Sequence, residues 1–114
     1  MSDVSNAADQ YVSAAVKFGE TRVARDFEAG NEFADALQQL GRVLRRSPDG
    51  QTALKKMLGH ENVFVRLWAA GDALPFAQEV AVPVLEAIAA QKGLTGTSAY
   101  TTLTEWQAGR LVKD

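Results

Sequence analysis

The 114-residue sequence predicts an all-α protein, a right-handed stack of antiparallel helical hairpins with about six helices in a single domain over residues 1–114. Apolar residues recur at intervals of three and four along most of the chain, which places them on one face of a helix. No stretch alternates apolar and polar residues over a useful length, so we expect no strand. Glycine, proline and capping residues divide the chain into segments of helical length.

The first expected helix spans residues 4–18. Apolar residues from Val4 to Phe18 recur at intervals of three and four, so they fall on one helical face. Gly19 follows this stripe and is a natural place for the helix to stop, because glycine readily adopts the conformation that ends helices. A short ambiguous stretch then leads to the second helix.

The second expected helix spans residues 26–46 and carries an apolar stripe from Phe33 to Leu44. Gly30 lies inside or just before this helix, which indicates either a close contact with another helix or a bent or late helix start. Arginines near residue 46 complement the partial negative charge of the helix C-terminus.

The third and fourth expected helices span residues 48–58 and 62–74. Ser47 can cap the third helix, and Pro48 suits its first position. The turn between the two helices is very short, so they are expected to form an antiparallel hairpin. We expect the fourth helix to end before Pro75, because proline disfavours helical geometry in the residue that precedes it.

The last two expected helices span residues 80–91 and 98–110 and form a second hairpin. Pro83 has to lie in the first turn of its helix, because a deeper position costs about 3 kcal/mol. Residues 94–97 have the composition of a loop, and Ser98 or Thr97 is expected to cap the final helix.

The fourth expected helix organises the predicted core. Val65, Ala69 and Ala73 fall four residues apart, with Trp68 beside them. Small side chains along this stripe allow a second helix to approach closely, while Trp68 fills the edge of the contact. Asn62 suits the N-cap, because its side-chain oxygen can accept from the free amides of the first turn. The stripe therefore predicts a helix that is buried along this face.

The run Val-Arg-x-x-Ala-Ala-x-x-Ala-Leu at residues 65–74 resembles the second helix of a HEAT-type repeat, and residues 52–58 then resemble the first helix of the same pair. The resemblance implies that Val65 and the alanines pack inside and that Arg66 bridges to a neighbouring loop. Arg66 is accordingly interpreted as a structural ion pair or a clamp on carbonyl groups, which is favoured over ligand binding.

From Tyr11 to Leu111 the chain also resembles a bacterial HEAT-like family known as domain of unknown function 2019. The most specific parts of this resemblance are residues 60–74 and 84–89. It implies a HEAT-like α–α superhelix. These are packing signatures, so the resemblance implies no particular chemistry.

Composition excludes several classes of function. The formal net charge of −2 gives no electrostatic case for nucleic acid or anionic membranes, and the absence of cysteine excludes disulfides and thiolate metal sites. The first residues are acidic and lack the apolar core of a signal peptide. No apolar run approaches the roughly 20 residues that a membrane span needs. We therefore expect a cytoplasmic protein that does not contact membranes.

No constellation typical of an enzyme stands out. His60 is the only histidine, and its place in a tight turn favours a capping or loop role over catalysis or metal binding. Gly93 and Gly96 lack the spacing and the following lysine of a phosphate-binding loop. Several carboxylates are candidates for a catalytic pair by residue type only, and we interpret them as solvated helix faces: Asp9, Glu28, Glu32, Asp35, Glu86 and Glu105. We expect no enzymatic activity and no cofactor or metal.

A basic cluster is the candidate interaction patch, formed by Arg42, Arg45, Arg46, Lys55 and Lys56. These side chains flank one short turn, so they could form one surface for a phosphate backbone or an acidic protein partner. The simpler interpretation, a solvated charge run that complements the helix dipole, is favoured. If the patch is functional, a protein partner is favoured over nucleic acid, since no aromatic residues interleave with the charges to stack on bases.

The function favoured by the sequence is a non-catalytic protein-interaction module whose partner is unknown. The first alternative is a nucleic-acid-binding domain that uses the basic patch, and the second is small-ligand binding or an enzymatic role in a groove near Trp68. Trp68 and Trp106 are interpreted as core residues, with exposed binding anchors as the alternative. A short helical stack exposes its end faces, which allows a homodimer, and the oligomeric state stays open.

Overall fold

Helices account for most of the chain, and the predicted all-α class is confirmed. The computed structural model describes residues 2–111, and within them the chain forms five helices and no strand. Met1 and residues 112–114, which the expected domain includes, lie outside the described residues. The helices are α1 (Ser2–Ala24), α2 (Phe27–Arg45), α3 (Pro48–Met57), α4 (Val63–Ala89) and α5 (Leu94–Gln107).

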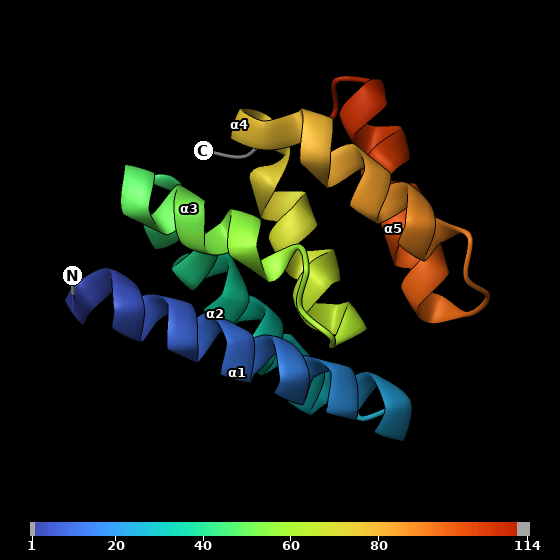
Figure 1. Ribbon diagram of the computed structural model, residues 1–114. Coiled ribbons are helices and arrows are strands. Elements are labelled where there is room, and N and C mark those ends of the chain that lie inside the picture. The colour runs from blue at the N-terminus through green and yellow to red at the C-terminus, as the bar shows by residue number, and fades with distance from the viewer. Residues whose placement is uncertain (1, 112–114) are drawn as a thin grey trace.

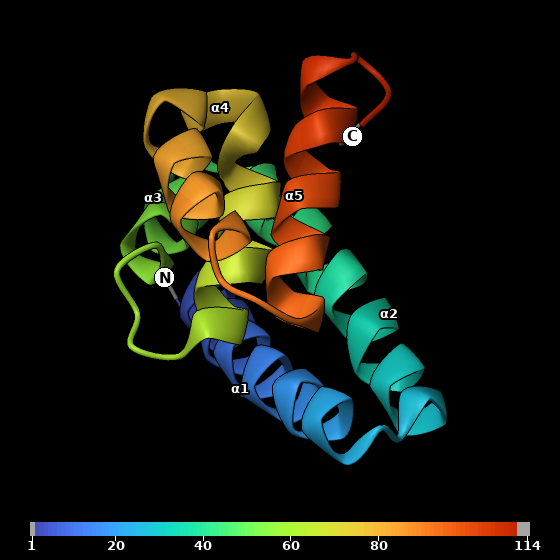
Figure 2. The ribbon, with the colours of Figure 1, turned by 90° about the vertical axis from the view of Figure 1, so that its right-hand side faces the viewer.

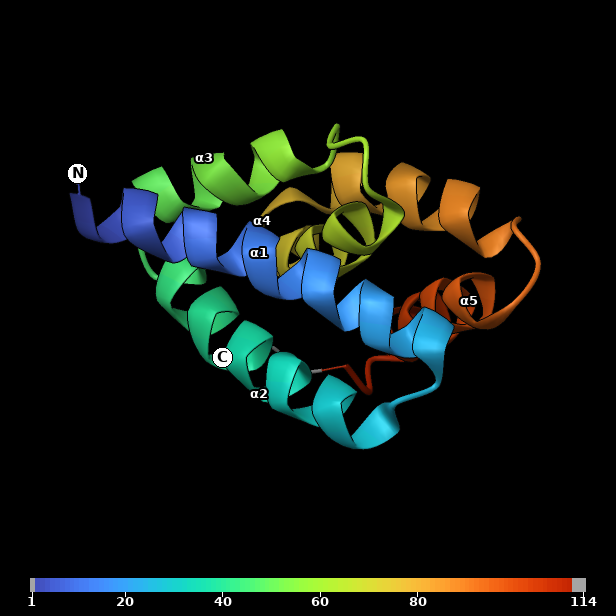
Figure 3. The same cartoon turned by 90° about the horizontal axis from the view of Figure 1, so that it is seen from below.

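The helices are arranged as two groups that share α4. Figure 1 shows α1, α2 and α3 on one side of the molecule and α5 on the other, with the bent α4 between them. Seen from below, α1 and α2 run antiparallel, α3 flanks α1 on its other side, and α4 lies behind α1 (Figure 3). Figure 2 shows that the second half of α4 and α5 also run antiparallel.

Side-chain caps begin three helices close to the predicted positions. The Asp26 side chain accepts a hydrogen bond from the amide of Ala29 at 3.2 Å at the start of α2. Ser47 caps α3 in the same way and Pro48 occupies its first turn, as expected. Asn62 caps α4, where its Oδ1 accepts from the amide of Phe64 at 2.8 Å. These starts depend on local chemistry, which is why the sequence predicts them.

The first helix is longer than predicted, because Gly19 does not end it. α1 continues through Gly19 to Ala24. The ring of Phe64 packs directly on Gly19, and a Cβ atom at this position would collide with that ring. Gly19 is therefore a point of close helix approach and not a helix stop. The helix ends instead where Arg25 adopts a left-handed conformation with φ of 60°.

Gly30 is explained by a close contact between α1 and α2. It is buried in the first turn of α2, and a Cβ atom there would lie 2.8 Å from the hydroxyl oxygen of Thr21. Of the two interpretations left open by the sequence, the close helix contact is the one observed.

The expected break at residues 75–79 is a kink and not a loop. α4 passes through Pro75, and Ala77 alone departs from helical geometry, with φ of −150° and ψ of 46°. Pro83 lies beyond the first turn after this kink, contrary to the expectation. Both prolines are exposed, and the carbonyl group that Pro83 leaves unbonded belongs to Glu79, an exposed residue that water can reach. Two of the six expected helices are therefore one bent helix.

The final helix begins earlier than predicted. Residues 94–97 form its first turn and not a loop, and Gly93, with φ of 100°, leads into it. Gly96 is buried against the carbonyl group of Gln91, where a Cβ atom would collide. Gly96 was expected in a loop, but it lies inside a helix, where close packing requires a residue without a Cβ atom.

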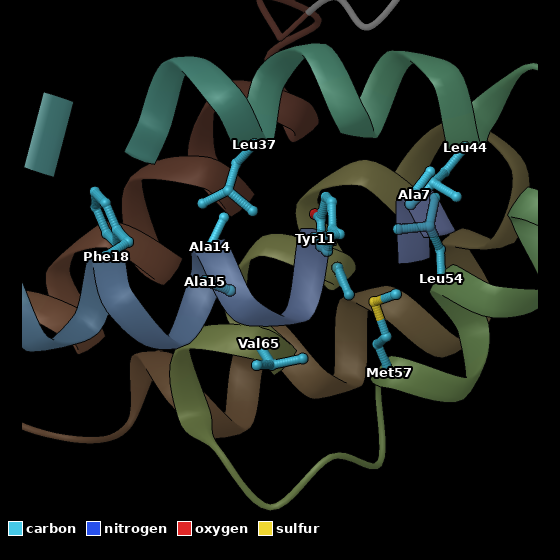
Figure 4. Close-up of a cluster of buried hydrophobic side chains, with 11 residues drawn as sticks. Ala7, Tyr11, Ala14, Ala15, Phe18, Leu37, Leu44, Leu54, Met57 and Val65 are labelled. Atoms are coloured by element: carbon cyan, nitrogen blue, oxygen red, sulfur yellow. The ribbon is translucent and has the colours of Figure 1, made fainter. Parts of the chain in front are cut away.

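The apolar core consists of two clusters joined through α4. The first is formed by α1, α2, α3 and the start of α4, and Figure 4 shows its side chains converging around Tyr11. The second is formed by α4 and α5. Val65 and Ala69 belong to the first cluster, Ala73 belongs to the second, and all three are 0% exposed. The predicted burial of this small-residue stripe is confirmed.

Two glycine-to-alanine substitutions should have opposite effects on stability. In Gly50→Ala the new Cβ would collide with the backbone carbonyl group of Leu44, which we expect to destabilise the protein by about 1–3 kcal/mol. In Gly71→Ala the new Cβ would meet only Thr102, at 4.0 Å, so the gain in helix propensity should stabilise the protein by about 0.5–1 kcal/mol. Urea unfolding of both variants checks this pair, and equal effects would contradict the packing described here.

Candidate functional site

A buried polar network joins three helices at the centre of the molecule. Asp72 of α4 is only 2% exposed. Its Oδ2 accepts a hydrogen bond from the Tyr11 hydroxyl of α1 at 2.5 Å, and its Oδ1 forms an ion pair with Nη1 of Arg45 from α2. A Cβ atom on Gly41 would lie 2.5 Å from Asp72 Oδ2, so only glycine leaves room for the carboxylate.

The network is closed to substrates and holds the helices together. Tyr11 is 0% exposed, and the Arg45 side chain is 9% exposed. Burial raises the pKa of the Tyr11 hydroxyl well above its usual value, and the negative charge of Asp72 raises this pKa further. The hydroxyl is therefore protonated and acts as a hydrogen-bond donor. This arrangement stabilises the contact of α4 with α1 and α2.

Asp72 is the residue that sequence reasoning missed. Its signal is nevertheless present, because it is the single charged residue in the run Ala-Ala-Gly-Asp-Ala-Leu at residues 69–74. A charge in such a stretch needs a partner when the helix is buried. Tyr11 lies within the apolar stripe expected from Val4 to Phe18 and is buried there, although its hydroxyl group has a polar role.

The five residues of the basic patch are not equally available to a partner. Arg45 binds buried Asp72, which removes it from the patch, whereas Arg42 and Arg46 are exposed at the end of α2. Lys55 and Lys56 are exposed in the last turn of α3, and α2 leads into the opposite end of that helix. The candidate patch is therefore reduced to four exposed residues, Arg42 and Arg46 at the end of α2 and Lys55 and Lys56 on α3.

The turn before α4 explains the roles of His60 and Arg66. His60 Nδ1 accepts a hydrogen bond from the amide of Asn62 at 3.0 Å. Arg66 Nη1 donates to the carbonyl oxygens of His60 at 2.7 Å and of Glu61 at 3.0 Å. The clamp on carbonyl groups expected for Arg66 is present, and the His60 ring holds the same turn.

The candidate carboxylates lie on helix surfaces and do not form a buried pair. Glu105 accepts three hydrogen bonds from Arg110, and this hydrogen bonding lowers the pKa of Glu105. The other five candidates are exposed: Asp9, Glu28, Glu32, Asp35 and Glu86. Within residues 2–111, no three histidine or carboxylate side chains come together in a way that could hold a metal ion.

Aromatic rings connect α1 to α4. The ring centroids of Phe18 and Trp68 are 5.3 Å apart, with an interplanar angle of 87°, and Phe18 also meets Phe64 at 6.3 Å. Trp68 and Trp106 are both partly buried, and the indole nitrogen of Trp106 donates to Gln78 at 3.1 Å. Both tryptophan side chains therefore pack mainly against other residues, and part of each side chain remains exposed to solvent.

Two hollows adjoin this aromatic cluster on the surface. The first, here called the α1–α4 groove, is an open hollow of about 400 Å³ lined by Val16, Gly19, Glu20, Val23, Ala24, Asn62 and Phe64. The second, here called the Trp68 pocket, is a smaller and more enclosed hollow of about 160 Å³ between α1, α4 and α5. Since Tyr11, Asp72 and Arg45 are inaccessible, these hollows are the candidate binding sites.

Comparison with known proteins does not assign the chain to a family. No family model matches it, and neither the curated proteins nor the solved structures include a match. Among the described helices, none combines the length and the apolar character needed to cross a membrane. A functional interpretation therefore rests on the geometry of the chain itself.

Disrupting the buried network should destabilise the protein in graded steps. Tyr11→Phe removes one hydrogen bond from a buried carboxylate and should cost about 1–3 kcal/mol. Asp72→Asn removes the charge that Arg45 binds and should cost about 3–5 kcal/mol. In a double-mutant cycle followed by urea unfolding, Tyr11→Phe should cost much less in the Asp72→Asn background. Additive effects would contradict the direct contact.

Stability should also fall at high pH because of Tyr11. The pKa of this hydroxyl is raised in the folded protein, so above about pH 10 the unfolded chain loses this proton first, and ionisation favours unfolding. The stability contributed by the protonated hydroxyl is present below this range and is lost as the pH rises above it. Urea unfolding between about pH 9 and 11 should show a smaller decline for Tyr11→Phe than for the native chain. Tyr100→Phe, at a side chain that is 65% exposed, is the control.

Proposed function

We propose that this chain is a non-catalytic protein-interaction domain that binds an apolar side chain of a partner protein in the α1–α4 groove. One observation carries the proposal: the groove is apolar, and Val23 on its wall is 80% exposed. Burying a valine side chain contributes about 1.5–3 kcal/mol, so this residue is a strong candidate for an interface anchor.

The shape of the groove favours a protein over a small molecule. The hollow is wide and shallow, so a small ligand would leave much of its surface in water. A protein partner supplies its own surrounding surface, which excludes water from a central apolar contact. Glu20 is exposed and lies on the wall of the groove, so a partner with a lysine or arginine beside its apolar anchor fits best.

Phe27 is a second exposed apolar side chain near the α1–α2 turn. Its side chain is 49% exposed at the start of α2, and the guanidinium group of Arg22 lies 6.0 Å from its ring centroid. Together Val23 and Phe27 place two large apolar side chains near the α1–α2 turn. Such neighbouring exposed residues are typical of interaction surfaces.

A HEAT-like arrangement is part of this proposal. In it, α1–α2, α3 with the first half of α4, and the second half of α4 with α5 would be three stacked hairpins. Stacks of this type present extended surfaces to protein partners. The resemblance stated above supports this arrangement and also a bacterial, cytoplasmic setting.

Nucleic-acid binding is the competing proposal, and the burial of Arg45 weakens it. We expect no salt-dependent shift of a labelled DNA duplex at low ionic strength. A shift that Arg46→Glu abolishes would favour nucleic-acid binding over the groove. Arg46 is the suitable residue for this test because it is exposed, whereas reversing Arg45 would break the ion pair with Asp72.

Charge introduced into the groove should abolish partner binding without affecting the fold. In Val23→Glu a carboxylate replaces an exposed apolar side chain on the groove wall. Val43→Glu is the matched control, because Val43 is 51% exposed on α2 and does not line the groove. Affinity capture from the native cytosol, quantified by mass spectrometry, should show a partner that is retained by the native chain and Val43→Glu and lost by at least about tenfold with Val23→Glu.

The same variants identify the occupant. If the native chain self-associates in sedimentation experiments and Val23→Glu does not, the partner is a second copy of this chain. Equal capture by Val23→Glu and Val43→Glu would contradict the groove as the binding site.

A further inference from the structure

The Trp68 pocket combines aromatic lining residues with a cation. Phe18 and Trp68 line it with their rings nearly perpendicular and their centroids 5.3 Å apart, and Gly71 also contributes to the lining. Ser98 and Thr102 of α5 line the pocket as well. The hollow is distinct from the α1–α4 groove, and no residue lines both.

The volume of the pocket matches a single aromatic ring. It measures about 160 Å³, and an engineered apolar protein cavity of about 150 Å³ binds benzene. A six-membered ring is therefore close to the largest rigid body that it can enclose. Since one side of the pocket is open to solvent, a polar substituent on that ring can remain at the mouth.

Arg22 places a positive charge at the pocket. Its guanidinium group lies 5.1 Å from the ring centroid of Phe18 and 6.0 Å from that of Phe27, so two rings hold it in position. Within residues 2–111, no carboxylate lies within ion-pair distance of Arg22, and the Ser98 hydroxyl makes no hydrogen bond. Both groups are therefore able to bind an anionic ligand, for which the planar guanidinium is well suited.

We propose that the Trp68 pocket binds a small carboxylic acid with a flat apolar body, such as an aromatic acid. The ring lies against Phe18 and Trp68, and the carboxylate accepts hydrogen bonds from Arg22 and Ser98. This site does not depend on the α1–α4 groove or on a protein partner.

Titration with benzoate, followed by two-dimensional ¹H–¹⁵N NMR, tests this proposal. The two tryptophan indole signals act as separate reporters, since Trp68 lines the pocket whereas Trp106 binds Gln78 elsewhere. We expect the Trp68 signal to shift with a dissociation constant of about 1 mM, as is typical of a ligand of this size. Benzamide has the same ring without the charge and should bind at least about tenfold more weakly.

Two variants separate charge recognition from shape. Arg22→Gln keeps much of the side chain but removes the charge, so benzoate should bind at least about tenfold more weakly while benzamide is unaffected. Arg25→Gln, at an exposed residue outside the pocket, is the matched control and should bind benzoate normally. Gly71→Ala adds a methyl group to the pocket wall at a position with room for it, so it should weaken both probes while the protein stays folded.

Three results would overturn the proposal. One is the absence of any Trp68 shift at about 10 mM benzoate, ten times the expected dissociation constant. Another is equal affinity of the native chain for benzoate and benzamide. This comparison uses the native chain alone, so it does not depend on whether a variant folds. The third is a shift of the Trp106 signal alone, which would place the binding elsewhere.

Discussion

The carboxylate of Asp72 is the interaction on which the rest of the fold depends. It binds Tyr11, 61 residues earlier in the chain, and Arg45, 27 residues earlier, so one buried group joins α4 to both helices of the first hairpin. A buried carboxylate without such partners would strongly destabilise the protein. Any packing that rotated α4 away from α1 and α2 would break these bonds. The network therefore selects one orientation of a helix that is apolar over much of its surface.

Close packing around Asp72 depends on small residues, and this is where the prediction from sequence was most successful. The stripe of Val65, Ala69 and Ala73 is fully buried, as its spacing indicates. The caps at Ser47 and Asn62 were also predictable, because each involves residues within one turn. Local periodicity and local capping chemistry are present in the sequence and need no knowledge of distant contacts.

The helix boundaries that were predicted incorrectly depend on a contact or a bend that exists only in the folded protein. Gly19 and Gly96 are residues of the type that commonly ends or interrupts a helix. Both nevertheless lie inside helices, where another group packs directly on the backbone. Pro75 was expected to end a helix, but the chain bends at Ala77 and the helix continues. In each case a contact or bend in the folded protein decides between two local options. A single sequence contains the glycine or proline and does not reveal which option the fold selects.

For charged residues, too, the sequence alone does not show which side chains become buried and paired in the fold. Arg45 and Arg46 are adjacent and chemically identical, but successive residues of a helix point in directions about 100° apart, so one reaches Asp72 and the other faces solvent. Asp72 was recognisable as an isolated charge among small apolar residues, whereas its partners were not. The α1–α4 groove and the Trp68 pocket are each lined by residues from more than one helix, and a single sequence does not show which helices meet. For this reason the sequence indicated only the neighbourhood of Trp68 as a possible binding site.

The aromatic cluster makes both hollows depend on the same helix contact. Phe64 lines the groove and Trp68 lines the pocket, while Phe18 of α1 packs against both rings. Residues of α1 and α4 line both hollows, and the bond from Tyr11 to Asp72 joins the same two helices inside the core. We therefore expect a change in the buried network to affect both surfaces. A change confined to one hollow leaves the network intact, so loss of a single binding activity in a stable protein identifies the surface responsible for it.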